Sequence, residues 1–226
     1  MTTARAMYER HWQAAAPSAS EGGEIVELAG AVLAPVDRLL DLGCGRGRIV
    51  ALARERCRAV HACDVAETAA RAGLAAGGHV VCADLNGGLP YRDASFDTVT
   101  CLEVIEHVLD PALLLAEARR VLKARGTLLL STPNIRYVRN IARLVLAGEF
   151  PHTATDRFVW GGGHVHYFTR RDLAGLLRGA GFTALEFAVN PRQFQRSWKR
   201  RWLARAMGRA RFGEWLCAGI FVRATA

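Results

Sequence analysis

One stretch near the start of the chain constrains its fold more than any other. Residues 39–47 read Leu-Leu-Asp-Leu-Gly-Cys-Gly-Arg-Gly. An apolar run of this kind predicts a buried strand, and three alternate glycines after it predict a tight turn into a helix. Because glycine has no Cβ atom, such a turn lets backbone N–H groups approach a ligand closely. The plainer interpretation is a strand-to-helix turn that binds nothing.

The spacing of the glycines narrows the choice of ligand. Gly43, Gly45 and Gly47 match neither the G-x-G-x-x-G pattern of dinucleotide enzymes nor the G-x-x-x-x-G-K-[ST] pattern of phosphate-binding loops. Asp64 ends the next apolar run, 21 positions after Gly43. A carboxylate at the tip of a second parallel strand can accept hydrogen bonds from both ribose hydroxyls. The pattern therefore favours a nucleoside as the ligand.

Apolar runs and helical patterns alternate along the rest of the chain, which predicts an α/β fold with parallel strands, right-handed crossovers and helices on both faces of the sheet. We expect strands over 36–42, 59–64, 79–83, 96–101, 126–131, 182–189 and 216–224, and helices over 48–56, 67–76, 111–123 and 169–179. Residues 1–35 are expected to form a helical cover. Residues 134–168 and 190–215 leave carboxyl ends of strands, so they are predicted to form a lid on the substrate side of a single domain, 1–226.

Composition limits the class of protein. The chain has 226 residues, of which 51% are hydrophobic and 23% charged, enough for one substantial core. Its six cysteines include no C-x-x-C pair, so we expect reduced core residues. The amino end carries charge, and no run approaches the roughly 18 apolar residues of a membrane span. These features predict a cytoplasmic protein.

The positive charge is concentrated in one segment. The formal net charge is +9, and residues 191–213 contribute eight basic residues and no acid. Apolar residues recur there every four positions, at Phe194, Trp198, Trp202, Ala206 and Ala210. A cationic helix with an apolar stripe is typical of an interfacial segment. It predicts contact with a membrane surface and an anionic or lipid-linked substrate, with RNA as the alternative polyanion.

The glycine motif resembles the first motif of class I S-adenosylmethionine-dependent methyltransferases. The resemblance implies a Rossmann-like, mainly parallel seven-stranded sheet with an antiparallel last strand, and S-adenosylmethionine as cofactor. It further implies that Asp84 accepts from the adenine amino group and that the Leu85 N–H faces the ring; a solvated strand-end carboxylate is the alternative for Asp84. The implied donor-binding residues are Asp41, Gly43, Gly45, Gly47, Asp64, Asp84 and Leu85, with Glu103 beside them.

Three later motifs resemble a subset of this class. Residues 103–107 fit E-x-x-E-H, residues 131–134 read Ser-Thr-Pro-Asn, and residues 164–169 correspond to H-x-x-[FY]-[FW]-T. The subset includes ubiquinone-biosynthesis O-methyltransferases and small-RNA 3′-terminal 2′-O-methyltransferases. The correspondence runs from about residue 41 to residue 182, which is most of the chain.

These motifs leave three interpretations open. Glu103, Glu106, His107 and His164 form a set that can bind a divalent ion, and in parts of the subset these positions are metal ligands. In the metal-free interpretation, which we adopt, His164 and His107 are the catalytic acid and base. In the third, the histidines are structural. A histidine base favours methylation of a small-molecule, sugar or lipid-linked hydroxyl, with an RNA 2′-O-methyltransferase or a non-catalytic nucleoside-binding regulator as alternatives.

Overall fold

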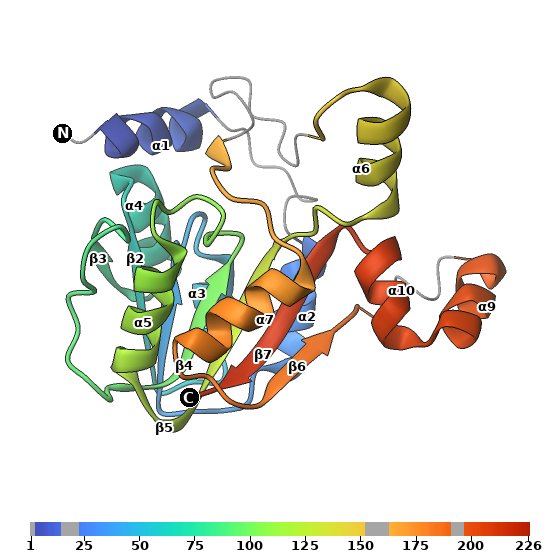
Figure 1. The fold of residues 1–226 in the computed structure, drawn as a ribbon. Helices are drawn as coiled ribbons and strands as arrows, with labels where there is room; N and C mark the ends of the chain where they lie inside the picture. The colour runs from blue at the N-terminus through green and yellow to red at the C-terminus, as the bar shows by residue number, and fades with distance from the viewer. Residues whose placement is uncertain (1–2, 15–22, 152–162, 191–196) are drawn as a thin grey trace.

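The structure is a computed structural model that describes residues 3–14, 23–151, 163–190 and 197–226. Within these residues the chain forms a seven-stranded sheet in the order β3-β2-β1-β4-β5-β7-β6 (Figure 1). The strands are β1 (Arg38–Leu42), β2 (Ala59–Asp64), β3 (His79–Cys82), β4 (Phe96–Leu102), β5 (Leu122–Pro133), β6 (Leu185–Ala188) and β7 (Gly219–Thr225). Strands β1 to β5 are parallel, and β7 runs antiparallel to both its neighbours. The predicted fold class is confirmed.

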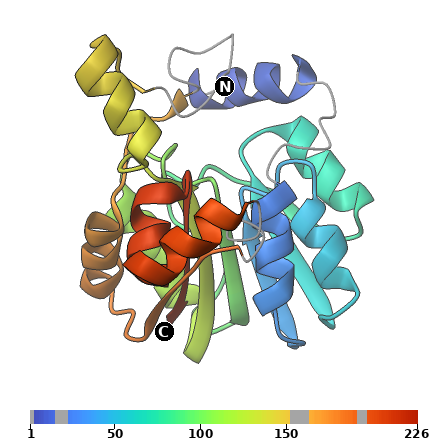
Figure 2. The same cartoon turned by 90° about the vertical axis from the view of Figure 1, so that its right-hand side faces the viewer.

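Helices cover both faces of the sheet (Figures 1 and 2). They are α1 (Thr3–Ala14), α2 (Gly23–Val32), α3 (Arg48–Arg54), α4 (Glu67–Ala75), α5 (Pro111–Val121), α6 (Val138–Ala142) with the π-helical turn η1 (Arg143–Ala147), α7 (Arg170–Gly179), α9 (Trp198–Met207) and α10 (Arg209–Leu216). Helices α5 and α7 pack on one face, and α2 and α3 on the other. The segment expected to be helical cover contains α1 and α2.

The alternation of side chains along β1 explains why both faces are apolar. Leu40 and Leu42 belong to the core under α5 and α7, whereas Leu39 belongs to the core under α2 and α3. All three are fully buried because successive strand residues point to opposite faces. Burying a leucine side chain stabilises the fold by roughly 1.5–3 kcal/mol. A central strand of a sheet covered on both sides therefore needs the continuous apolar run that the sequence shows.

Side-chain caps fix the start of two helices. The Asp110 carboxylate accepts hydrogen bonds from the N–H groups of Ala112 and Leu113, each at 3.0 Å, ahead of Pro111 in the first turn of α5. At α7, Thr169 and Asp172 form a reciprocal capping box. Each cap satisfies N–H groups that a helix start leaves without partners, which contributes about 1 kcal/mol. Both helices begin where the sequence predicts.

The expected boundary between α5 and β5 is wrong. The helix expected to reach Lys123 ends at Val121, and β5 begins at Leu122, four residues before the predicted start. Leu122 is 2% exposed and pairs with Phe96 at the start of β4. Lys123 then donates a 2.6 Å hydrogen bond to Asp97. These long-range contacts outweigh the helical pattern of residues 122–123, a local signal that tertiary packing often overrides.

Both predicted insertions contain helices at the carboxyl side of the sheet. Helices α6 and η1 lie in the first, and α9 and α10 in the second; residues 152–162 and 191–196 lie outside the described part of the chain. Asn134 joins the two insertions, because its side-chain amide donates to the carbonyls of Glu214 and Cys217, each at 2.9 Å. Among the described helices, none has the length and hydropathy that crossing a bilayer requires.

Candidate active site

The glycine loop connects β1 to α3 at the carboxyl edge of the sheet. Gly43, Gly45 and Gly47 all adopt positive φ, at 70°, 48° and 71°, the left-handed region that favours glycine. The N–H groups of Gly43 and Cys44 both donate to the Cys63 carbonyl at the end of β2. The loop is thereby held against the neighbouring strand, and the predicted turn from strand to helix is present.

Asp64, the last residue of β2, reaches back to this loop. Its Oδ2 accepts from the Gly45 N–H and its Oδ1 accepts from the Ala66 N–H, both at 3.0 Å. Asp64 is 6% exposed, and burial raises the pKa of its carboxyl group, partly offset by the backbone N–H donors. Each oxygen can accept a second hydrogen bond. A ribose is therefore a suitable ligand here, and the ribose role of Asp64 stays a prediction.

Helix α1 lies across this edge of the sheet, over α4 (Figure 1). Trp12 covers the glycine loop so closely that a Cβ atom added to Gly45 would come within 2.8 Å of its indole ring. The Arg46 guanidinium lies 5.6 Å from the same ring. Glu9 accepts from the hydroxyl and the N–H of Thr68 at the start of α4, which ties α1 down. Sequence reasoning missed Trp12 and Glu9, which belong to no motif.

The same face of α1 also reaches the histidine motif. Tyr8 lies one turn before Trp12, and its ring packs edge-on against His107 with 5.8 Å between the ring centroids. Residues four apart on a helix have Cβ atoms about 5–6 Å from each other. One turn of α1 therefore spans the distance between the glycine loop, which Trp12 covers, and His107, which Tyr8 contacts. Val104 makes a second link, since its side chain packs against Gly43.

Asp41 lies beneath the loop. It is 3% exposed, and its Oδ1 accepts a 2.6 Å hydrogen bond from the Thr100 hydroxyl of β4. Burial raises the pKa of Asp41 to about 7; the Thr100 hydrogen bond opposes this shift, and nearby Asp64 adds to it. Its predicted contact with the donor remains untested.

Asp84 follows β3 at the same edge. Its Oδ1 accepts from the N–H of Asn86 at 3.0 Å and from the amide side chain of Asn86 at 2.8 Å. The side-chain oxygen Oδ1 of Asn86 in turn accepts from the Leu109 N–H at 2.6 Å, which connects Asp84 to the residues just before α5. Leu85 is 8% exposed and belongs to the core under α5. The adenine roles predicted for Asp84 and Leu85 stay predictions.

Glu103 has an unusual backbone. It is a non-glycine residue with a φ of 57°, and its N–H donates to both the carbonyl and the hydroxyl oxygen of Ser131 at 3.1 Å. The Ser131 hydroxyl donates back to the Glu103 carboxylate at 2.7 Å. Burial raises the pKa of Glu103, partly offset by this bond. A left-handed, non-glycine residue held by such reciprocal bonds is a feature that concentrates at functional sites.

Three of the four residues that the sequence suggests as ligands of a divalent ion lie together. Ligand atoms of Glu106, His107 and His164 all lie within 4.8 Å of one another, whereas Glu103 is not part of this group. The two imidazole rings meet edge-on, with 4.5 Å between their centroids. His107 Nδ1 lies 3.2 Å from the Gly163 carbonyl, so it donates there and leaves Nε2 as the acceptor.

Burial controls the charge of this cluster. It lowers the pKa of His107 to about 4, with His164 adding to the shift, and it lowers the pKa of His164. It raises the pKa of Glu106 well above its usual range, and Glu103 raises it further. Both imidazoles are therefore neutral near pH 7 and can accept a proton.

Glu106 provides the test of whether a metal ion suits the cluster. Its Oε2 accepts from the Thr132 hydroxyl at 3.0 Å, but its buried Oε1 accepts no hydrogen bond from the described residues and lies 4.0 Å from His164 Nε2. A buried carboxylate oxygen without a donor, beside two neutral imidazoles, fits a divalent cation. If bound, such an ion would be held by Glu106, His107 and His164, and would lower the pKa of a coordinated hydroxyl.

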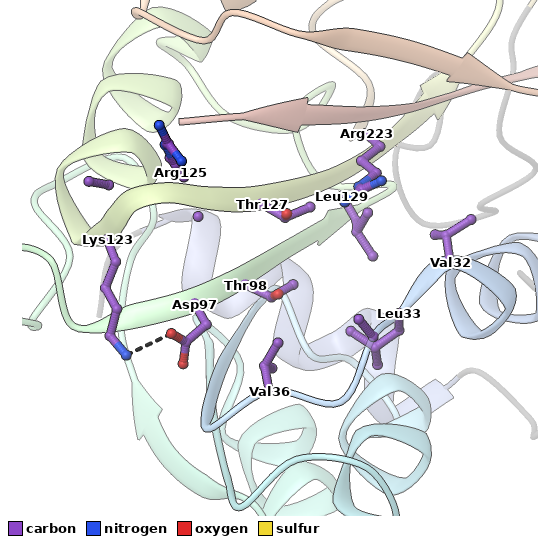
Figure 3. Close-up of a pocket in the computed structure, with 13 residues that line it drawn as sticks. Val32, Leu33, Val36, Asp97, Thr98, Lys123, Arg125, Thr127, Leu129 and Arg223 are labelled. Carbon is purple, nitrogen blue, oxygen red and sulfur yellow. Dashed lines mark hydrogen bonds and ion pairs between the residues drawn. The ribbon is translucent and has the colours of Figure 1, made fainter.

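The cavity shown in Figure 3 lies elsewhere. It has a volume of about 240 Å³, and residues at the amino ends of β4 and β5 line it, together with part of α2 and Arg223 of β7. It therefore occupies the opposite edge of the sheet from the glycine loop. Lys123 at its rim pairs with Asp97, and Arg223 pairs with Glu186. None of the predicted site residues lines it.

The fold and the glycine loop with its strand-end carboxylates define a class I S-adenosylmethionine-dependent methyltransferase. The profile of the methyltransferase domain family matches residues 10–186, and the chain belongs to this family. Among its relatives, a ubiquinone biosynthesis O-methyltransferase of Xanthomonas euvesicatoria pv. vesicatoria is 35% identical over 168 residues, 69% of this chain and 64% of the relative. One of Idiomarina loihiensis is 34% identical over 50% of this chain and 48% of the relative. The matches thus span about half to two thirds of these relatives.

Solved structures show the same fold. An S-adenosylmethionine-dependent methyltransferase from Mesorhizobium loti superposes with a TM-score of 0.66 at 23% identity, over 91% of this chain and 99% of that one. Phosphoethanolamine N-methyltransferase 2 of Haemonchus contortus, solved in complex with S-adenosyl-L-methionine, has a TM-score of 0.62 at 15% identity, over 99% of this chain and 57% of that one. At these identities the likeness concerns the fold alone.

Proposed function

We propose that this protein transfers a methyl group from S-adenosylmethionine to a hydroxyl group of a small-molecule, sugar or lipid-linked substrate. The observation that carries the proposal is the position of α1, whose Trp12 covers the glycine loop while Tyr8, one turn away, packs on His107. This arrangement supports a donor site and a pair of neutral imidazoles within reach of each other. The ubiquinone-biosynthesis relatives, which are O-methyltransferases by name, and the E-x-x-E-H motif at 103–107 support a hydroxyl substrate.

S-adenosylmethionine, when bound, supplies an electrophilic methyl group on a positively charged sulfur. The chain must therefore hold the substrate oxygen in line with that methyl group, exclude water and remove one proton. We assign the removal of the substrate proton to His164, whose side chain is only 6% exposed. His107 positions it, since the Gly163 carbonyl fixes the His107 tautomer and its ring meets that of His164 edge-on. The motif-matched donor residues from Asp41 to Glu103 are proposed to bind the donor.

The experiment compares two histidines of the same loop. His164→Ala is expected to lose methyl transfer while keeping donor affinity by calorimetry, because a general base contributes about 10²–10⁴-fold to rate. His166→Ala is the matched control, since the His166 side chain lies 3.3 Å from the Leu109 carbonyl and beside Phe168, and it is not part of the group formed by Glu106, His107 and His164. Transfer is followed from isotopically labelled donor into lipid, soluble-metabolite and RNA fractions of a cell extract.

Each result has a distinct meaning. Label in the lipid or soluble fraction supports the proposal, and label in RNA supports a 2′-O-methyltransferase instead. Donor binding with no transfer into any fraction indicates a nucleoside-binding regulator. Full transfer by His164→Ala contradicts the assigned base. The assay is repeated with EDTA and then with added Mg²⁺ or Mn²⁺. Transfer that continues in EDTA indicates a metal-free base. Transfer that stops in EDTA and returns with the added ion indicates an ion held by Glu106, His107 and His164.

A further inference from the structure

Helix α9 presents two tryptophans on its outer face. Trp198 and Trp202 are 68% and 64% exposed, which is unusual for the largest apolar side chain. Ala206 continues the same stripe one turn later, because residues four apart lie on one face of a helix. The helix lies at the far right of the molecule in Figure 1 and faces the viewer in Figure 2.

The other face of α9 accounts for its attachment to the protein. Leu203, Ala204 and Met207 are half-buried, and α9 packs on α10. The segment between β5 and α6 contacts α10, because its Arg136 pairs with Glu214 and lies 4.2 Å from the centre of the Trp215 ring. The packing of α9 therefore uses its small and medium-sized apolar residues. The two tryptophans keep about two thirds of their surface exposed.

The charges beside the tryptophans all have one sign. Lys199, Arg201 and Arg205 are exposed and flank the stripe, and α9 contains no acidic residue. The Lys199 ammonium lies 5.8 Å from the Trp198 ring. An apolar stripe bordered by cations on both sides has the arrangement of a helix that lies in the plane of a membrane interface. Tryptophan in particular prefers the level of the lipid headgroups.

A second exposed apolar element lies on the same side of the molecule. In η1, Val145 is 72% exposed and Leu146 is 84% exposed. Because Asn134 and Arg136 tie the start of the first insertion to α10, the two insertions form one connected unit. In Figure 1, α6 and α9 both lie at the right of the molecule, and in Figure 2 α6 stands above and to the left of α9.

We propose that the outer face of α9, formed by Trp198, Lys199, Arg201, Trp202 and Arg205, binds the surface of a membrane rich in anionic lipid. Tryptophans would enter the headgroup region while the basic side chains contact phosphates. A second copy of this chain fits the face poorly, because two such cationic faces repel each other. The inference goes beyond the proposed methyl transfer and does not depend on which hydroxyl is methylated.

The experiment measures sedimentation of the full chain with vesicles. Vesicles of phosphatidylcholine with about one third phosphatidylglycerol are compared with pure phosphatidylcholine at physiological salt. We expect binding to the anionic vesicles and little to the neutral ones. The Trp198→Ser/Trp202→Ser variant should bind on the order of tenfold more weakly or worse, because it loses the interfacial anchors. Replacement of Lys199, Arg201 and Arg205 by Glu should weaken binding further, since each basic residue near such a surface raises the affinity roughly fivefold.

The controls use exposed residues outside the insertions. Leu74 on α4 is 62% exposed and Arg92 is an exposed cation, so Leu74→Ser/Arg92→Glu removes comparable surface chemistry elsewhere. This control should bind vesicles like the parent chain. Unchanged donor affinity by calorimetry in all variants shows that they are folded, and separates a failure here from a failure of the proposed methyl transfer.

Three results would overturn the inference. The first is equal binding of the parent chain and the tryptophan variant to anionic vesicles. The second is self-association in sedimentation equilibrium that depends on Trp198 and Trp202 without any vesicle binding, which would assign the face to a second copy. The third is indifference to vesicles together with salt-sensitive binding of single-stranded RNA through the same residues.

Discussion

The indole ring of Trp12 lies directly over Gly45, so close that a Cβ atom at Gly45 would come within 2.8 Å of it. The contact joins the first described helix to the loop that characterises the fold. Gly45 also donates its N–H to Asp64, so one residue contacts both the cover and the strand-end carboxylate.

Gly45→Ala is expected to weaken donor binding by at least tenfold, because the new methyl group collides with Trp12 and the backbone at φ 48° disfavours alanine by about 1–2 kcal/mol. Trp12→Ala should relieve the collision but not the backbone strain. A double-mutant cycle on the free energy of unfolding should therefore show favourable coupling on the order of 1 kcal/mol. Additive effects of the two changes would mean that Trp12 does not rest on the loop.

Asp64→Ala is expected to abolish measurable donor binding by calorimetry. Loss of two hydrogen bonds to a charged group corresponds to about 3 kcal/mol or more, a factor of over one hundred in affinity. Asp37→Ala, at an exposed position just before β1, is the matched control and should bind the donor normally. Unchanged affinity of the Asp64 variant would remove the proposed ribose contact.

Asp41 is expected to make stability depend on pH. Its pKa is raised to about 7 in the folded protein, so between about pH 4 and pH 7 the folded state holds a proton that the unfolded state has released. The free energy of unfolding should therefore fall as pH rises through this window and level off above it. The free energy of unfolding of Asp41→Asn should lack this fall, which amounts to up to about 4 kcal/mol between pH 4 and pH 8. Urea unfolding at pH 4, 6 and 8 would check the prediction, and parallel slopes for the two proteins would contradict it.

Asn134→Ala is expected to destabilise the fold by about 2–4 kcal/mol, because Asn134 is fully buried and its side chain makes three hydrogen bonds, including one accepted from the Arg136 N–H. The matched control is Asn140→Ala, which removes one bond, to the Asn134 carbonyl, at a half-buried position. Its cost should be about 1 kcal/mol. Chemical denaturation measures both, and equal costs would show that the two insertions are not joined through Asn134.

The sequence predicts the sheet and the residues at its carboxyl edge because these depend on local pattern. Strand-length apolar runs, separated by helical segments, leave few topologies open. Asp41, Asp64, Asp84 and Glu103 lie at or just after strand ends, and parallel strands bring those ends to one edge. The boundary error at Leu122 arose where pairing with a distant strand decided the conformation.

The part of the site that the sequence does not predict depends on contacts between distant residues. Trp12, Tyr8 and Glu9 contact residues far along the chain, and no local pattern reports such pairings. Glu103 is separated from Glu106, His107 and His164 by its backbone conformation, which the sequence pattern does not indicate. The left-handed backbone of Glu103 turns its side chain to Ser131, while Glu106 faces Thr132 and the histidines.

The place of β7 in the sheet has a consequence for how the protein is made. Strand β6 pairs with β7 and, in the described sheet, with no other strand, and β7 is also the antiparallel neighbour of β5. Synthesis from the amino end produces β7 after the other six strands. Until it leaves the ribosome, β6 has no partner and the edge of β5 is open to other chains, so nascent copies need protection from aggregation during that interval.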